Sequence, residues 1–312
     1  MDLTAIASQF VNFTTVFLGI FIEAAPFLLL GTLASGLVEE FVRREDLLTL
    51  MPRSRFLAPL VGGLMGIVFP VCECGVIPLT RRLYRKGLPL AAGVSFLLAA
   101  PIINPVVLAS TFAAYGFGTV LLARFGFGLL VAVLVGILFS FSPSVYRVTV
   151  PETMIPLAGG SGDTVPMVSL LPDEPFAARM KRALRVAGEE FFEMGQYLIA
   201  GSLLAALMQT FIPQSALLSI GAGPFVSVVA MQVLAYVLSI CSTVDAFVSL
   251  AFLNTFTTGS VLAFLVFGPM VDIKSTLMFM GVFKRKYVIY LVLLPFLLTL
   301  LMGVFINLNV NW

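Results

Sequence analysis

The chain has 312 residues, of which 60% are hydrophobic and only 11% are charged. Soluble domains average about 45–50% apolar and about 25% charged residues, so a soluble globular protein, a disordered chain and a disulfide scaffold are excluded. The net charge of +2 is too small to indicate nucleic-acid binding, and the absence of histidine excludes histidine metal sites and histidine proton relays. The composition predicts a polytopic membrane protein, and nothing in it indicates a cofactor.

The first apolar segment covers residues 10–38, which exceeds the roughly 20 residues that a membrane-spanning helix needs. Asp2 is the only charge before Glu23, whereas a cleaved signal peptide begins with positive charge. We therefore expect a retained helix and a location in a prokaryotic plasma membrane.

Seven further apolar segments follow in chain order, near residues 56–80, 88–115, 119–141, 191–212, 222–253, 258–281 and 287–306. The polar stretch 142–176 separates the fourth segment from the fifth and holds six prolines, which favour a linker over a regular element. The expected organisation is thus a first transmembrane repeat over 1–141, a Pro/Gly-rich linker over 142–176 and a second repeat over 177–312.

Matched landmarks in the two halves indicate an internal duplication. They recur in the same order at a nearly constant offset of 168 to 170 residues, pairing Glu23 with Glu193, Cys72 with Cys241, and Pro101 with Pro269.

The basic loop residues predict the topology, because cytoplasmic loops collect Lys and Arg. If all eight segments crossed, the loops would carry seven basic residues on one side and nine on the other. If segments 56–80 and 222–253 instead enter and leave on the same side, all sixteen fall on one side. We therefore expect an all-α fold with six crossings and two re-entrant segments, an inverted second repeat, a cytoplasmic linker and an outside N-terminus.

The first re-entrant segment is expected to break at Pro70, Gly75 and Pro78, because non-helical backbone at membrane depth must be buried in protein or line a cavity. The Gly62-x-x-x-Gly66 pattern that precedes the break favours close helix packing.

All three cysteines fall at the predicted breaks of the re-entrant segments, with Cys72 and Cys74 in the first and Cys241 in the second. Transporters built from inverted repeats bind their solute between such interrupted helices. Glu73 and Asp245 lie beside these cysteines, and a carboxylate at membrane depth normally faces a cavity or a partner. The pattern predicts a solute site with proton coupling at Glu73 or Asp245. Buried apolar cysteines and helix-capping carboxylates are the structural alternatives.

A second pair of breaks is predicted around Asn104 and Asp272, at Pro101–Pro105 and Gly268–Asp272. These side chains could coordinate the solute or satisfy the backbone groups that proline leaves free. Lys274 could neutralise Asp272 or extend toward the cytoplasm. The matched pair Glu23 and Glu193 adds two proton-coupling candidates, and symmetry places Glu23 nearer a membrane surface than the bilayer centre.

The run Phe69–Leu79, which reads FPVCECGVIPL, followed by Pro101–Pro105, PIINP, resembles the predicted-permease family that includes the ArsP organoarsenical efflux proteins and YraQ-like proteins. The resemblance covers essentially the whole chain and implies an inner-membrane permease. In arsenical exporters cysteine thiolates hold the metalloid, a role that would fall to Cys72 and Cys74 with Cys241 opposite. Those exporters also use a cysteine pair in the first helix, and residues 10–38 contain none. The resemblance therefore implies a permease without specifying the cargo.

Three hypotheses follow from these residues. The leading one is a permease, not an enzyme, that moves a small thiophilic solute by alternating access: a metalloid, a soft metal ion or a sulfur-containing molecule. No Walker A motif is present, so direct use of ATP is not expected. The alternative is a transmembrane thiol–disulfide electron carrier that pairs Cys72 or Cys74 with Cys241. A scaffold without transport is the third. The expected partners are the lipid bilayer and the solute, with a homo-oligomer left open.

Overall fold

The computed structural model describes residues 3–52, 54–69, 71–141, 145–150, 176–211, 223–253 and 255–309. These residues form helices and their connections, and the only β-pairing among them is one bridge between Thr149 and Phe283. In chain order the helices are α1 (Leu3–Phe41), α2 (Arg44–Leu50), α3 (Leu57–Val68), α4 (Glu73–Arg85), α5 (Leu90–Ile103), α6 (Pro105–Tyr115), α7 (Thr119–Ser140), α8 (Val145–Val148), α10 (Phe176–Phe211), α12 (Val226–Leu238), α13 (Asp245–Leu250), α14 (Thr258–Met270), α15 (Ile273–Val282) and α16 (Arg285–Asn309).

Six helical stretches are long and apolar enough to cross a membrane, namely Ser8–Phe41, Leu90–Tyr115, Thr119–Ser140, Phe176–Thr210, Thr258–Val282 and Arg285–Asn309. They coincide with the six segments that the sequence predicts to cross. The two segments predicted to be re-entrant instead contain the shorter apolar helices α3 and α12. With 12 and 13 residues, both fall short of the roughly 20 that a crossing requires.

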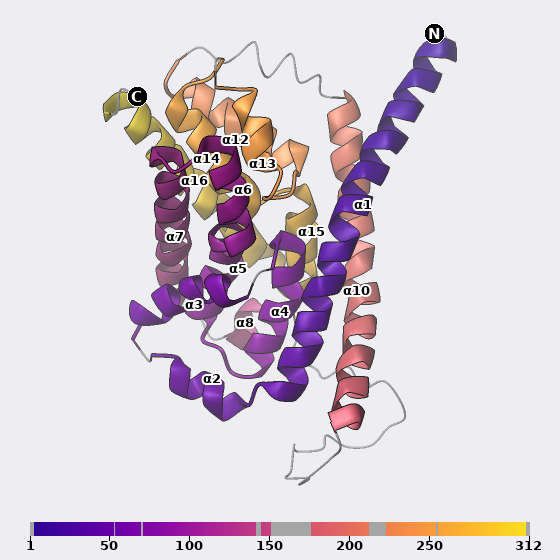
Figure 1. The fold of residues 1–312 in the computed structure, drawn as a ribbon, viewed down its shortest axis with the longest axis vertical. Coiled ribbons are helices and arrows are strands. Elements are labelled where there is room, and N and C mark those ends of the chain that lie inside the picture. Colours follow the sequence, from indigo (N-terminus) through magenta and orange to yellow (C-terminus); the bar gives the residue numbers. More distant parts are fainter. Residues whose placement is uncertain are drawn as a thin grey trace.

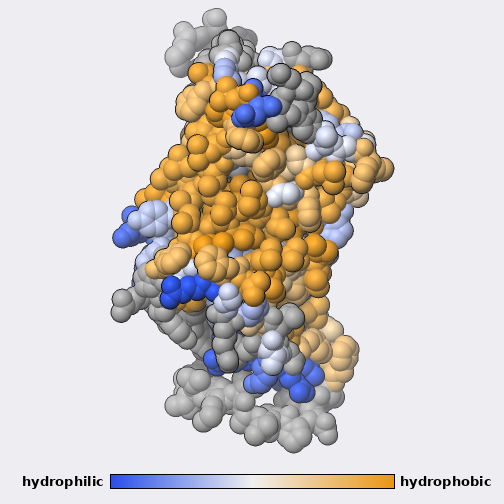
Figure 2. Space-filling model, turned by 90° about the vertical axis from the view of Figure 1, so that its left-hand side faces the viewer, coloured by the Kyte–Doolittle hydropathy of each residue, from blue (hydrophilic) through white to orange (hydrophobic). Residues whose placement is uncertain are grey.

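The long helices stand roughly along one axis (Figure 1), with α1 and α10 side by side at one edge and α2 and α3 lying across it. Helix α1 begins and α16 ends at the same end of the molecule, whereas α2 and the C-terminal end of α4 lie toward the opposite end. Figure 2 shows a broad hydrophobic surface around the middle, with hydrophilic residues gathered mainly toward the two ends. The surface is that of a multi-pass membrane protein.

Each predicted break is present as an interruption between helices, but the first is shorter than expected. Residues 69–72 separate α3 from α4, and residues 239–244 separate α12 from α13. Gly75 and Pro78, expected to be part of the first break, instead lie inside α4. Proline can sit there because it removes only one hydrogen bond, the one that its N–H would donate to the carbonyl of Cys74. Pro70 lies outside the described residues.

The second pair of breaks is shorter than predicted. Helix α5 continues through Pro101 to Ile103, and only Asn104 separates it from α6. Helix α14 likewise continues through Pro269, and residues 271–272 separate it from α15. Both prolines therefore lie near the C-terminal ends of their helices, where each removes the hydrogen bond that its N–H would donate to the carbonyl four residues earlier.

Helix α10 begins at Phe176, fifteen residues before the predicted segment 191–212. Its first turns are the charged stretch before Glu193, and Arg182 there pairs with Glu40 of α1 at 3.2 Å. Most of the predicted linker, residues 151–175, lies outside the described residues. Its described part, 145–150, forms the one-turn helix α8 and the bridge to Phe283.

Glycines allow several helices to approach closely. A Cβ built at Gly31 of α1 would overlap the backbone of Gly75 in α4, and one at Gly62 of α3 would overlap Ala92 in α5. Small residues at such crossings are typical of helix packing in membranes. The Gly62 contact fits the packing role expected for the Gly-x-x-x-Gly pattern, and Gly31 holds the start of α4 against α1.

Candidate functional site

The four polar residues predicted at the breaks all lie at helix N-termini. Glu73 and Asp245 stand in the first turns of α4 and α13, and Asn104 and Asp272 are the N-caps of α6 and α15. The unpaired N–H groups and the helix dipole at an N-terminus favour negative charge and hydrogen-bond acceptors. This shared placement explains why acidic and amide side chains occur at all four breaks.

Lys274 joins two of these helix starts. Its Nζ lies 3.4 Å from Asp272 Oδ2 and 3.8 Å from Glu73 Oε1, and it donates a 2.6 Å hydrogen bond to the carbonyl oxygen of Ser239. The side chains of Lys274, Asp272 and Glu73 are all at most 5% exposed. Of the two readings from the sequence, neutralisation of Asp272 is therefore confirmed, and the extension toward the cytoplasm is wrong.

The three cysteines lie within electrostatic range of the same lysine. Cys72, Cys74 and Cys241 are free and buried, and the ammonium group of Lys274 interacts electrostatically with Cys74, Cys241 and Glu73. Cys72 is the N-cap residue of α4, next to Glu73. Thiols from both predicted breaks are thus brought to one buried place, together with one cation and two carboxylates. We call Cys72, Glu73, Cys74, Cys241, Asp272 and Lys274 the central cluster.

Asn104 and Asp272 have clear structural roles. Asn104 Oδ1 accepts a 2.8 Å bond from the backbone N–H of Val106, and its Nδ2 lies 3.4 Å from the carbonyl oxygen of Val71 in the first break. Asp272 forms a reciprocal capping box with Ser275. Asp272 Oδ2 accepts no hydrogen bond within the described part of the chain and faces Lys274 at 3.4 Å. The capping readings are therefore confirmed for these two residues, while Asp272 also belongs to the central cluster.

Asp245 lies in a different cluster, with Arg124 of α7. Arg124 Nη2 is 2.6 Å from Asp245 Oδ2 and 3.3 Å from the carbonyl oxygen of Ser242, and Nη1 is 2.8 Å from Thr111 Oγ1. The side chains of Arg124 and Asp245 are 1% and 4% exposed. We call Thr111, Arg124, Ser242 and Asp245 the α7–α13 cluster.

Glu23 and Glu193, matched in the sequence, have different surroundings. Glu193 Oε1 forms a 2.6 Å ion pair with Arg81 of α4. Glu23 lies near the middle of α1, and its buried Oε1 has no hydrogen-bond partner among the described residues. Its expected position nearer a membrane surface stays a prediction. Glu193 and Arg81 belong to a larger polar cluster.

That cluster fastens α4 to α10 and α1. Arg82 Nε lies 3.5 Å from Glu190 Oε1, and Ser35 Oγ donates a 2.6 Å bond to Glu190 Oε2. The side chain of Glu190 is completely buried. We call Ser35, Arg81, Arg82, Glu190 and Glu193 the α4–α10 cluster.

Lys86, in the connection that follows α4, caps the C-terminal end of α1. Its Nζ donates hydrogen bonds to the carbonyl oxygens of Glu39 and Val42 at 2.7 and 2.9 Å. Partial burial lowers the pKa of this lysine. A cation bound to the last carbonyl groups is a favourable C-terminal cap.

Sequence reasoning missed Arg124, Lys274, Arg82 and Glu190 as functional candidates. Arg124 and Lys274 carried a usable signal, because an ionisable residue inside an apolar segment is rare and normally has a partner. Arg82 and Glu190 were counted only as basic and acidic residues near the membrane surface.

The site contains no ready-made metal centre within the part of the chain that the structure describes, since no three Cys, Asp, Glu or His side chains there come close enough to hold an ion. The metal-ligand role that the family resemblance implies for Cys72, Cys74 and Cys241 stays a prediction.

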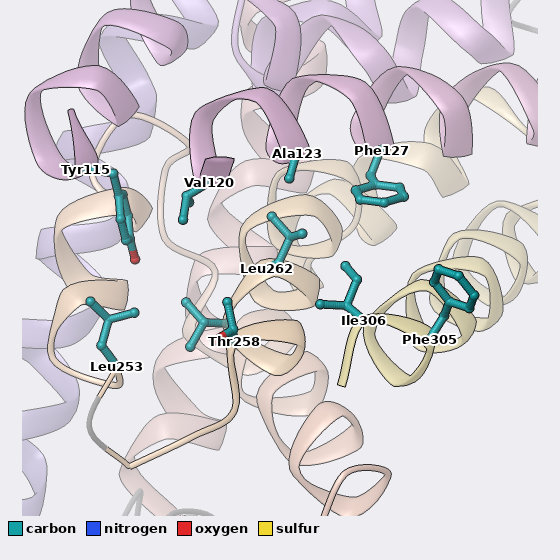
Figure 3. Close-up of a pocket in the computed structure, with 10 residues that line it drawn as sticks. Tyr115, Val120, Ala123, Phe127, Leu253, Thr258, Leu262, Phe305 and Ile306 are labelled. Carbon is teal, nitrogen blue, oxygen red and sulfur yellow. The ribbon is translucent and has the colours of Figure 1, made fainter. Parts of the chain in front are cut away.

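An apolar pocket of about 150 Å³ lies apart from the central cluster (Figure 3), between α6, α7, α14 and α16. Its lining residues are Tyr115, Val120, Ala123, Phe127, Leu253, Thr258, Val261, Leu262, Phe305 and Ile306, and they include no predicted site residue.

Comparisons with known proteins place the chain in a family of predicted permeases. A family model described as a predicted permease matches residues 9–308. The protein named "UPF0718 protein YcgR" from Bacillus subtilis (strain 168) is 43% identical over 295 residues, covering 91% of this chain and 93% of the relative. A protein from Streptococcus mutans serotype c, named "Putative two-component membrane permease complex subunit", is 37% identical over 279 residues, covering 89% of each chain. No solved structure shows a significant match.

Proposed function

Because the chain belongs to the ArsP-type family of predicted permeases, we propose that its central cluster is the binding site for a small, soft solute that crosses by alternating access. The observation that carries the proposal is the burial of three free thiols beside Lys274, Glu73 and Asp272, where helices α4 and α15 begin. Thiolates prefer soft ions and metalloids, and helix starts inside a membrane offer polar groups to a solute. The solute is a metalloid, a soft metal ion or a sulfur-containing molecule.

Glu73 is the proposed coupling residue. Its Oε2 is buried and accepts no hydrogen bond from the residues that the structure describes, and Lys274 is 3.8 Å from the other oxygen. A carboxyl group with one free oxygen can take a proton without breaking a hydrogen bond at that atom. Protonation would remove one of the two negative charges that face Lys274 and so free this cation to interact with the solute or its thiol ligands.

We propose that the two transmembrane halves are inverted repeats with re-entrant segments at α3–α4 and α12–α13. Matched roles support this arrangement: Asn104 and Asp272, 168 residues apart, each cap the helix that follows a break. Gly31 and Gly201, 170 residues apart, each lie where α1 or α10 closely approaches a helix start. In this arrangement the basic loops and the linker face the cytoplasm of a prokaryotic cell, and the N-terminus lies outside.

The Streptococcus mutans relative, whose name describes a subunit of a two-component permease complex, supports a second subunit for this chain as well. A homo-oligomer is the other arrangement. The mass of the purified protein–detergent complex, measured alone and after co-expression with a genomic neighbour, distinguishes the two.

Flux into proteoliposomes tests the transport proposal. The probes are Ag⁺, trivalent arsenite and cysteine, one from each solute class, each measured with and without a pH gradient. We expect one class to cross faster than in protein-free liposomes and its flux to fall at least tenfold in Glu73→Gln. Glu45→Gln, at an exposed site on α2, is the matched control and should leave flux unchanged. Equal flux in the Glu73→Gln and Glu45→Gln proteins would remove the proposed coupling role.

A thiol–disulfide electron carrier remains the second candidate, because Lys274 interacts electrostatically with both Cys74 and Cys241, which come from different breaks. Thiols are counted in the protein purified with and without reductant. Three free thiols in both preparations support the permease, whereas a reversible loss of two thiols that includes Cys241 supports the carrier.

A further inference from the structure

Two buried ion-pair clusters lie on opposite sides of the central cluster along the long axis of the molecule. The α4–α10 cluster holds the C-terminal half of α4, which lies toward the end that carries α2 (Figure 1). The α7–α13 cluster holds α13, which lies toward the end where α1 begins and α16 ends. The α4–α10 cluster therefore holds α4, and the α7–α13 cluster holds α13. The two clusters lie on opposite sides of the three thiols.

The α4–α10 cluster closes the first side. Arg82 stands nine residues after Glu73 on α4, about 13 Å along the helix, and pairs with the fully buried Glu190 of α10. Ser35 of α1 donates to the other oxygen of Glu190, so three helices meet at one carboxylate. The neighbouring pair of Arg81 and Glu193 adds a second link between the same helices α4 and α10.

The α7–α13 cluster closes the second side, and two of its residues, Ser242 and Asp245, closely follow Cys241 in the chain. The backbone N–H of Asp245 donates a 3.1 Å bond to the carbonyl oxygen of Cys241. Arg124 bonds the Asp245 carboxylate at 2.6 Å and also the carbonyl oxygen of Ser242, the residue next to Cys241. A 2.6 Å hydrogen bond between Tyr115 and Ser249 joins α6 to the same helix α13.

We propose that these two clusters are the gates of the permeation path and that both are closed in this structure. The inference rests on the proposed permease function, and it assigns positioning roles to Arg124, Asp245, Arg82 and Glu190. Closure of both gates accounts for the burial of Cys74 and Cys241, which are 1% and 4% exposed. Opening one gate exposes the central cluster to one face of the membrane only.

The chemistry of the clusters suits a gate. A buried ion pair that loses one partner leaves an uncompensated charge, so each cluster is stable when closed and opens when water or another group satisfies its charges. Ser239, directly after α12, has an unusual backbone conformation. It is the only non-glycine residue with positive φ in the described ranges, at 49°. A strained residue at the start of the 239–244 segment is a suitable hinge for its movement.

Labelling of Cys241 tests the gates without any solute. The background is Cys72→Ser/Cys74→Ser, so that Cys241 is the single thiol, and a membrane-impermeant maleimide is added to proteoliposomes of known orientation from either face. Asp245→Asn should raise the labelling rate at least tenfold from the face where α1 begins and leave the other face unchanged. Glu190→Gln should do the reverse.

Two further variants separate gating from misfolding. The exchanged pair Arg124→Asp/Asp245→Arg should restore the slow rate of the background protein, and Arg124→Lys should give a smaller increase than Asp245→Asn. Labelling after denaturation confirms that the thiol is intact. Equal acceleration from both faces, or no change in either variant, overturns the proposal. If labelling shifts as expected but none of the probe solutes crosses, the gates stand and the proposed solute classes fall.

Discussion

Replacing Lys274 by Met should strongly destabilise the protein, because this one cation serves three acceptors. Its side chain is 2% exposed and faces Asp272, Glu73 and the carbonyl oxygen of Ser239. Methionine nearly preserves the length of the side chain but leaves two buried carboxylates without their cation. Removing one partner of a buried pair costs about 3–5 kcal/mol, which shifts the unfolding equilibrium by roughly two to three and a half orders of magnitude.

The free energy of unfolding in mixed detergent micelles measures this loss. Lys181→Met, at an exposed position on α10, is the control and should stay within about 0.5 kcal/mol of the parent protein. The double variant Glu73→Gln/Lys274→Met should recover part of the stability, because it removes one of the stranded charges. A double-mutant cycle then gives the coupling energy between the two residues.

Equal stability of the Lys274→Met and Lys181→Met proteins would refute the reasoning, because it would mean that the buried carboxylates do not depend on the lysine. A loss in Lys274→Met without any recovery in the double variant would show that the lysine acts through Asp272 and Ser239 alone.

Three further changes test the packing and the helix ends by the same measurement. Asn104→Ala should cost about 1 kcal/mol because α6 loses its cap, while Asn104→Ser, which keeps an acceptor, should cost less; equal losses would argue against capping. Gly62→Ala should cost about 1–3 kcal/mol, since its Cβ would overlap the backbone of Ala92, whereas nothing lies within 4 Å of a Cβ at Gly126, so Gly126→Ala should not destabilise α7. Lys86→Met should cost about 1–2 kcal/mol through the lost bonds to the last carbonyls of α1, and Lys181→Met again gives the reference.

The six long helices and the positions of the breaks could be predicted from the sequence because they depend on local chemistry. Apolar length identifies a helix that can cross, and proline or glycine with a polar neighbour marks an interruption. The predictions that were wrong also concerned local structure. Pro78 and Gly75 were assigned to the break, yet α4 begins at Glu73 and includes both. Pro78, the sixth residue of α4, removes one helix hydrogen bond without ending the helix.

The ion-pair partners could not be predicted in this way. Arg124 and Asp245 are 121 residues apart, and only the packing of α7 against the second break brings them together. A search for residues matched between the two halves also misses the two buried cations, Arg124 and Lys274. At the observed offsets of 168 and 169 residues, Lys274 corresponds to Val106 and Arg124 to Leu293. A duplication reveals what the halves share, whereas these charges belong to one half each.

The two kinds of contact in this protein suggest where motion occurs during transport. Contacts within each proposed repeat include close backbone approaches at glycine, as at Gly62 with Ala92 and Gly259 with Gly303. Between the repeats, one such approach joins α1 to α10 at Gly36 and Ala183. Other contacts between the repeats are polar pairs: Arg82 with Glu190, Glu73 with Lys274, and Arg124 with Asp245.

Closely packed backbones cannot slide past one another without overlap, whereas polar pairs can exchange a partner for water. Each repeat should therefore move as one body about the close contact between α1 and α10, with the polar contacts elsewhere breaking and re-forming between the repeats. A covalent cross-link between α3 and α5 should then leave flux intact, and one between α4 and α10 should stop it. If the α3–α5 cross-link stopped flux equally, motion within a repeat would be required, and the movement of the repeats as rigid bodies would have to be abandoned.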